Sequence, residues 1–309
     1  MDKCKKIMQY FPEKIKNILN VIKDNEWSCI NEINIINGQA MLIKIKGKLC
    51  FAGNKGLTHN INDAYRVDKY DIKKIYELIT NSSSYAYNRF INEGFLTLSG
   101  GHRVGLIGNC VVDDNKIVSV NHINSFCFRI THDNTGNAGL IVDDIYNNGK
   151  ILNTVIISPP GCGKTTFIRN LASIFGSTKK DYAILKCGII DERFEIAACF
   201  NGIPTLDVGC SSVIISGCSK NVAIPIVVRS MSPDILIADE LASSDDITAI
   251  KYAYASGCKV IATTHGYDEN NNELSNYNIK NFFDLLIVLD SSNGPGTITK
   301  IIRGDTIDT

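Results

Sequence analysis

A glycine-rich turn between an apolar run and a helical pattern constrains this sequence more than any other feature. The apolar run covers residues 154–157, the turn reads Ser-Pro-Pro-Gly-Cys-Gly-Lys-Thr-Thr over 158–166, and the helical pattern begins at Phe167. Where a strand, a tight turn and the start of a helix follow one another in this order, backbone N–H groups and the helix N-terminus point toward a bound anion. The sequence therefore predicts a phosphate-binding P-loop.

The chemistry of this turn depends on two of its residues. Lys164 would reach the β- and γ-phosphates of a nucleotide, and the Thr165 hydroxyl would bind Mg²⁺. The full pattern begins with glycine where this chain has Ser158, and a small residue still permits the turn. The alternative is an ordinary glycine-rich connection between a strand and a helix. The residues that we expect to contact ATP are Ser158, Pro159, Pro160, Gly161, Cys162, Gly163, Lys164, Thr165 and Thr166.

A second apolar run, 235–238, ends in the two carboxylates Asp239 and Glu240. An acidic residue at the C-terminal end of a parallel strand can hold Mg²⁺ opposite a P-loop, so Asp239 is predicted to share the metal with Thr165. The neighbouring Glu240 is predicted to orient the water that attacks the γ-phosphate. The alternative is a strand that runs into an acidic helix N-cap.

Two more predicted strands end in polar residues. The run 259–264 leads to His265, beside the strand that carries Asp239, where a neutral imidazole would sense the γ-phosphate. The alternative is a structural or merely exposed histidine. The run 189–190 leads to Asp191 and Glu192, one of which we expect near the attacking water or the metal, with Glu192 as the candidate catalytic residue. A solvated charged loop is the alternative there.

Phosphoryl transfer also needs positive charge where negative charge develops. The P-loop supplies only Lys164, so further cations would come from a neighbouring domain or subunit. Arg103 and Arg129, on predicted strands of the first half of the chain, are our candidates, and Arg229 is a third. The alternative for each arginine is a surface position or an ordinary ion pair.

The 309 residues are enough for two domains. Residues 1–132 are predicted to form an α+β domain and residues 133–309 a P-loop domain, with a polar linker at the boundary. In the first domain we expect helices at 12–24, 70–80 and 85–92, and strands at 30–36, 41–45, 48–52 and within 95–130. In the second we expect strands at 154–158, 183–190, 234–239, 259–264, 284–289 and 297–302, and helices at 139–147, 164–175, 220–230 and 245–255. Alternating strands and helices predict an α/β fold with a mostly parallel sheet.

Composition excludes several classes of protein. Hydrophobic residues make up 44% and charged residues 21%, which is typical of a globular chain, and the net charge of +0 argues against a large nucleic-acid footprint. The eleven cysteines include no CxxC pair, and no secretory signal opens the sequence, so we expect a reducing cytoplasm; the alternative is a zinc site. No apolar run approaches the ~20 residues of a membrane span.

Several motifs occur together in a specific order. They are Gly-Gly-His-Arg-Val-Gly at 100–105, the P-loop, Ile-Asp-Glu-Arg at 190–193 with Glu-Ile-Ala-Ala at 195–198, Asn-Gly-Ile-Pro at 201–204, Arg-Ser-Met-Ser-Pro-Asp at 229–234, the Asp239-Glu240 pair, and Thr-His-Gly at 264–266. Over residues 30–290 this combination resembles a sporulation family of the type II/IV secretion ATPase superfamily.

The resemblance implies a RecA-like P-loop NTPase domain preceded by a smaller α+β domain. It assigns the Walker A, Asp-box, Walker B and His-box motifs to 158–166, 190–195, 235–240 and 259–266. It further implies a homo-hexameric, Mg²⁺-dependent ATPase whose site lies between the two domains, with arginines supplied by the first.

The same resemblance implies that the ATPase docks from the cytoplasm on membrane proteins of a channel used in endospore formation. Two departures from the family pattern are Ser158 and the segment Leu-Ala-Ser-Ser at 241–244, where an arginine is expected. The alternative function is a nucleotide-dependent switch or nucleic-acid-binding protein with little turnover.

Overall fold

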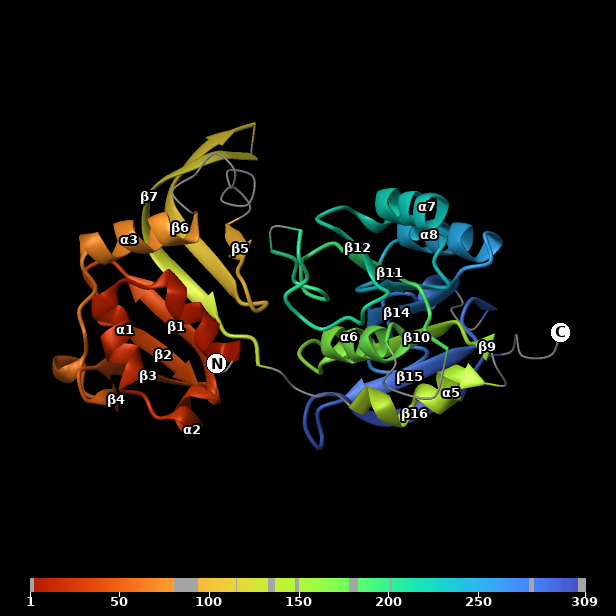
Figure 1. Cartoon of the computed structure of the whole chain (residues 1–309), viewed down its shortest axis with the longest axis horizontal. Helices are drawn as coiled ribbons and strands as arrows, with labels where there is room; N and C mark the ends of the chain where they lie inside the picture. The colour runs from red at the N-terminus through yellow and green to blue at the C-terminus, as the bar shows by residue number, and fades with distance from the viewer. Residues whose placement is uncertain are drawn as a thin grey trace. The chain divides into compact units, whose positions relative to one another are not determined.

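The chain folds into two units, Met1–Asp133 and Asn134–Thr309 (Figure 1). The computed structural model describes residues 3–80, 94–114, 116–132, 137–147, 150–177, 183–200, 202–277 and 281–304. The helix predicted at 85–92 lies outside the described residues. Each unit has its own core, so each is described by itself.

The first unit is built on a seven-stranded antiparallel sheet with strand order β4-β3-β2-β1-β7-β6-β5. A turn at Asn37-Gly38 connects β1 to β2, and Gly38 has the positive φ of 76° that favours glycine. The strands are β1 Ile30–Ile36, β2 Leu42–Ile45, β3 Lys48–Gly53, β4 Gly56–Thr58, β5 Phe95–Thr97, β6 Arg103–Asp113 and β7 Lys116–Arg129.

Helices bury the apolar side chains of this sheet on one face. The core joins Ile15 and Leu19 of α1, Ile75 of α3, and Phe126 and Phe128 of β7. The helix predicted over 12–24 ends earlier, because α1 stops at Asn20 and a separate turn, α2, follows. The helical segments are η1 Lys3–Tyr10, α1 Glu13–Asn20, α2 Asp24–Trp27, η2 Ile61–Asp63 and α3 Lys69–Ile79.

The second unit contains the predicted mostly parallel sheet, with order β12-β11-β13-β14-β10-β15-β16. All neighbouring pairs are parallel except β15 with β16. The strands are β10 Thr154–Ser158, β11 Cys187–Asp191, β12 Val213–Ser216, β13 Ile235–Ala238, β14 Lys259–His265, β15 Leu285–Asp290 and β16 Thr297–Arg303. A separate ribbon pairs β8 Tyr146–Asn147 with β9 Lys150–Ile151.

Helices cover both faces of this sheet, as Figure 1 shows. Alternate residues of β13 show the two faces, because Ile237 packs in the core with α6 and Leu236 packs in the core with α7 and α8. The helical segments of this unit are η3 Asn137–Leu140, α5 Val142–Ile145, α6 Lys164–Phe175, α7 Lys220–Met231, α8 Ser244–Ala255 and η4 Ser275–Tyr277.

Two expectations about this unit were wrong in detail, and one strand was missed. The helix predicted over 139–147 is a 3₁₀ turn, a single α turn and the first strand of the β8–β9 ribbon. The strand predicted at 183–190 begins only at Cys187, because residues 183, 184 and 186 are exposed while Cys187–Asp191 is buried. Strand β12 was not predicted, although Val213, Ile214 and Ile215 form a short apolar run; its four residues are only half-buried.

The strand order fixes where the predicted site must form. Strand β14 lies between β10, which carries the P-loop, and β13, which precedes Asp239. In the parallel register, Ser158 lies beside His265. The C-terminal ends of these strands meet at one edge of the sheet, which is where open α/β sheets bind their ligands.

Candidate active site

The P-loop has the backbone geometry of an anion cradle. Gly161 and Gly163 have φ of +78° and +85°, values that side chains other than hydrogen rarely allow. Gly163 is the N-cap residue of α6 and no side chain caps this helix. The N–H groups of the first turn are therefore not capped by a side chain, which is the arrangement that binds phosphate oxygens.

Lys164 lies beneath this loop and is buried, with 6% of its surface exposed. Its Nζ donates to the carbonyl oxygens of Ser158 and Pro159 at 3.0 and 3.3 Å and contacts Nδ1 of His265 at 2.8 Å. Burial lowers the pKa of the Lys164 ammonium, and the carboxylates of Asp239 and Glu240 oppose this shift. All three ammonium donors thus have protein partners that phosphate oxygens can replace.

The contact with Lys164 determines how His265 is protonated. An ammonium group only donates hydrogen bonds, so Nδ1 of His265 must accept, and Nε2 carries the ring proton. Nε2 lies 3.3 Å from Oε1 of Glu240 and donates to it. The imidazole therefore joins the P-loop lysine to the carboxylate that we expect to activate water.

Asp239 joins the P-loop helix to strand β14. Its Oδ2 accepts from the Thr165 hydroxyl at 2.5 Å, and its Oδ1 accepts from the Thr263 hydroxyl. One carboxylate and one hydroxyl side by side are the hard oxygen ligands that Mg²⁺ uses when phosphates complete its coordination. The described residues contain no group of three or more His, Cys, Asp or Glu that could hold a metal. A Mg²⁺ site that is completed by phosphate oxygens does not need such a group. Thr165 and Asp239 therefore fit Mg²⁺ that arrives with a nucleotide.

Glu240 adopts an unusual backbone conformation, with φ of 52°. Its N–H donates to the Thr263 hydroxyl at 2.8 Å and to Oδ1 of Asp239 at 3.1 Å. Its Oε2 contacts Nη1 of Arg193 in an ion pair. A cavity of about 20 Å³ lies beside this carboxylate, enough for one water molecule.

The two acidic residues after β11 have different surroundings. Asp191 is buried, and its carboxylate accepts from the backbone N–H groups of Glu195, Ile196, Ala197 and Ala198 at 2.7–3.1 Å. These bonds assign Asp191 to folding the loop. Glu192 borders the same small cavity as Glu240, and its Oε2 accepts from Nζ of Lys220 at 2.6 Å.

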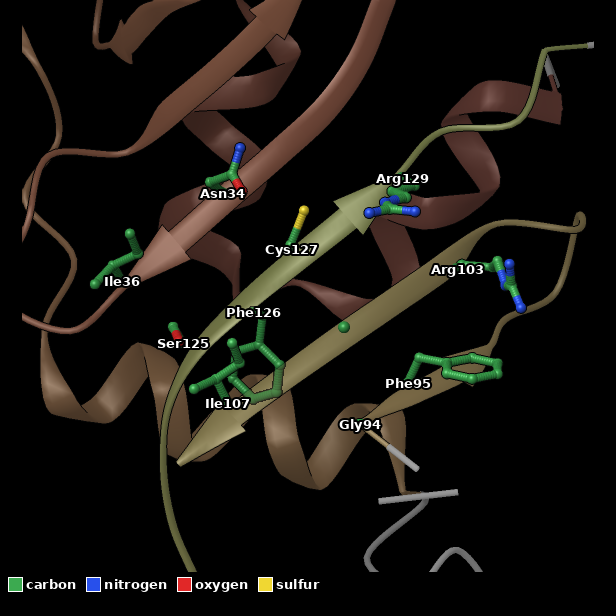
Figure 2. A pocket seen from close by; sticks show the side chains of 11 residues that line it. Asn34, Ile36, Gly94, Phe95, Arg103, Ile107, Ser125, Phe126, Cys127 and Arg129 are labelled. Atoms are coloured by element: carbon green, nitrogen blue, oxygen red, sulfur yellow. The ribbon is translucent and has the colours of Figure 1, made fainter. Parts of the chain in front are cut away.

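The arginine candidates lie in two different places. Arg103 and Arg129 belong to the first unit, where both line a pocket of about 500 Å³ on the sheet (Figure 2). They are directly opposite each other on β6 and β7, and the Arg103 guanidinium lies 4.4 Å from the centre of the Phe95 ring. Arg229 is exposed on α7 and lines a different pocket with Asp234 and Lys259, at the N-terminal ends of the strands. The structure therefore does not bring Arg229 to the P-loop of its own chain.

Three functional candidates were missed from the sequence. Thr263 was detectable, because it and His265 are two residues apart at the end of one strand and so share a face. Arg193 stands inside a motif that was noted only for its carboxylates. Lys220 gave no signal, since it meets Glu192 across 28 residues of chain.

Comparison with known proteins identifies the family of this chain. The family model described as sporulation stage III, protein AA, matches residues 1–307. The chain belongs to this family. A member from Bacillus subtilis (strain 168), stage III sporulation protein AA, is 33% identical over 304 residues, which are 97% of this chain and 95% of that protein. The family resemblance inferred from the motifs is thereby confirmed.

Solved structures confirm the predicted fold class. The pilus retraction motor PilT with bound ADP superimposes with a TM-score of 0.59 at 14% identity, over 96% of this chain and 83% of that one. The ATPase DotB of Legionella pneumophila superimposes with a TM-score of 0.52 at 13% identity, over 89% and 75%. The chain thus shares its fold with PilT and DotB, with a RecA-like P-loop domain after a smaller α+β unit. In the part of the chain that the structure describes, no helix is both long and apolar enough to cross a bilayer.

Proposed function

We propose that this protein is a Mg²⁺-dependent ATPase of the sporulation stage III protein AA family. The observation that carries this proposal is the continuous set of contacts from Lys164 through His265 to Glu240, beside the Thr165–Asp239 pair. Those side chains come from the P-loop helix and from the ends of two neighbouring strands. They combine the groups that phosphate binding, metal binding and water activation require.

Hydrolysis proceeds by attack of water on the γ-phosphorus. Lys164 exchanges its carbonyl and imidazole partners for phosphate oxygens, and the N–H groups of α6 hold the phosphate chain. Glu240 accepts a proton from the water as its oxygen bonds to phosphorus, and the bond from phosphorus to the ADP oxygen breaks. Thr165 and Asp239 would hold Mg²⁺, which would supply positive charge to the phosphate oxygens. His265 loses its lysine contact when phosphate is present and regains it when phosphate leaves.

Arg103 and Arg129 are proposed to supply the further positive charge. A row of charged residues crosses the first unit's sheet through the cross-strand positions Lys44, Glu32, Arg129 and Arg103. Lys44 and Glu32 form an ion pair of 3.5 Å. Two arginines directly opposite each other repel, so this end of the row favours an anion. A phosphate group bound to this chain or to a neighbouring copy is such an anion.

The cellular role follows from the family and is proposed with the activity. We assign the protein to a homo-hexameric ring that acts with membrane proteins of a channel complex in endospore formation, from the cytoplasmic side. Glu192 is a second candidate for orienting water, since it borders the cavity beside Glu240. Nucleic acid is not an expected ligand, because the net charge is +0.

Phosphate release from ATP with and without Mg²⁺ tests the activity. Glu240→Gln is expected to keep ATP binding and to lose at least about 90% of turnover, because an amide does not accept the proton. Lys164→Ala is expected to lose binding itself. Mass measurement with ATP and Mg²⁺ tests the ring. A Glu240→Gln protein that hydrolyses as fast as wild type removes Glu240 from this role, and ATP binding with no turnover in wild type supports the switch instead.

A further inference from the structure

Arg193 contacts the carboxylate of Glu240 but has no role in the reaction proposed above. Its Nη1 contacts Oε2 of Glu240, while the other carboxylate oxygen, Oε1, accepts from Nε2 of His265 at 3.3 Å. The carboxylate is therefore held on both sides, by a guanidinium and by an imidazole N–H. A guanidinium is always charged and presents its donors in a fixed plane, so it can fix orientation as well as charge.

Hydrogen bonds anchor the loop that carries Arg193. Four backbone N–H groups just beyond Arg193 bind the buried Asp191 carboxylate. Arg169 of the P-loop helix donates from Nε and Nη2 to the carbonyl oxygens of Ile196 and Glu195, both at 2.6 Å. The backbone at Arg193 is thus fixed to the same helix that begins at the P-loop. The guanidinium is presented to Glu240 from a fixed base.

Glu240 needs such a partner. Its backbone is anchored by the Thr263 hydroxyl and by Asp239, so its side-chain torsions are the freedom that remains. Asp239 is also the adjacent carboxylate, and like charges so close together repel. The positive charge of Arg193 offsets that repulsion. Both side chains border the water-sized cavity of about 20 Å³, so the ion pair determines where the carboxylate meets water.

We propose that Arg193 is a positioning residue that holds the Glu240 carboxylate toward the attacking water. This inference rests on the proposed ATPase activity and adds a residue to it. Arg193 acts through Glu240 and does not bind ATP. Its side chain is 60% exposed, so the ion pair is of the modest strength typical of exposed pairs. We therefore expect Arg193→Ala to lower kcat by about fivefold and to leave KM for ATP within about twofold.

A double-mutant cycle separates this role from a structural one. Turnover is measured for wild type, Arg193→Ala, Glu240→Gln and the double variant, with single-turnover reactions followed for hours so that slow variants are quantified. If Arg193 acts through Glu240, removing it from the Glu240→Gln protein has no further effect. Arg193→Lys keeps the charge and is expected to recover part of the lost kcat. Arg303→Ala is the matched control, because Arg303 forms a comparable exposed pair with Asp144 away from the P-loop.

The possible outcomes are distinct. A fall in kcat that disappears in the Glu240→Gln background, with partial recovery in Arg193→Lys, supports the proposal. Turnover equal to wild type, turnover above wild type, or an equal fall in both backgrounds overturns it while the ATPase activity stands. A change in KM alone assigns Arg193 to ATP binding and also overturns it. Absence of turnover in wild type refutes the proposed function instead. Should Arg193→Ala unfold, Arg193→Gln and Arg193→Lys carry the same comparison.

Discussion

Replacing Asp191 with alanine should destabilise the second unit severely. The carboxylate accepts four backbone hydrogen bonds, and three of these N–H donors, on Ile196, Ala197 and Ala198, are buried. Alanine leaves them without an acceptor, at about 1–3 kcal/mol for each buried donor. Some water will enter, so we expect a loss near the lower end of the sum, about 3–5 kcal/mol. That is a large fraction of the ~5–15 kcal/mol by which domains are stable.

Urea unfolding of the full chain measures this loss. With a denaturant slope of about 2 kcal/mol per molar, the midpoint of the transition should fall by about 2 M. The only tryptophan, Trp27, is buried in the first unit, so its fluorescence follows that unit. Far-UV circular dichroism follows the helices of both units. We expect the circular dichroism transition to move further than the fluorescence transition.

Two comparisons make the result decisive. Asp191→Asn keeps one carbonyl oxygen as an acceptor and should lose about half as much stability. Asp268→Ala is the matched control, because Asp268 also accepts two backbone N–H groups, at 2.8 Å each, but in an exposed loop where water replaces it. If Asp191→Ala unfolds within about 0.3 M urea of wild type with an unchanged slope, the assignment of Asp191 to loop folding is refuted.

Three further predictions concern the P-loop and its neighbours. Thr263→Val keeps the shape but removes the hydroxyl between Asp239 and the Glu240 N–H, so kcat should fall about tenfold with little change in nucleotide affinity; an unchanged kcat contradicts this role. Gly163→Ala places a Cβ at φ of +85° and 3.3 Å from Gly296 N, so thermal unfolding should show about 1–2 kcal/mol of lost stability together with weaker nucleotide binding. Burial lowers the pKa of Lys164, so as pH rises this ammonium loses its charge at a pH below 10.5, the usual lysine value. Titration with a fluorescent ATP analogue should show affinity falling as the pH rises through this lowered pKa. Glu240→Gln removes a charge that raises this pKa, so its affinity should fall at a lower pH than wild type; an identical profile would contradict the electrostatic argument.

Local patterns predicted the P-loop unit well where burial is continuous. Strands β10 and β13 are fully buried, and their apolar runs are bounded by polar residues, so each was visible in the sequence. The sequence also placed the strand of His265 beside the strand of Asp239, and β13 does pair with β14. The pairing of β14 with β10, in which Ser158 lies beside His265, was not predicted. Strand β12 was missed although three of its four residues are apolar, and it differs from β10 and β13 in being only half-buried.

The partners of the predicted residues were harder to obtain. Lys164, Asp239 and His265 each follow a motif with a known chemical reason, but the contact of Lys164 with His265 joins residues 101 positions apart. Such a contact depends on strand order, which periodicity does not give. The ion pairs of Arg193 and Lys220 were missed for the same reason, because long side chains reach carboxylates only after the loops that carry them have folded. The placement of Asp191 also required the folded loop, because its four donors come from the backbone.

The three contacts made by Lys164 have a consequence for selectivity among anions. Its carbonyl and imidazole partners compete with any incoming ligand, so an anion gains only the difference between two sets of bonds. A polyphosphate chain gains the N–H groups of α6 as well as the lysine and displaces these internal partners. A single inorganic phosphate or sulfate ion makes fewer such bonds. Inorganic phosphate and sulfate should therefore be weak inhibitors. The product phosphate should leave readily, and Lys164 then regains its internal contacts.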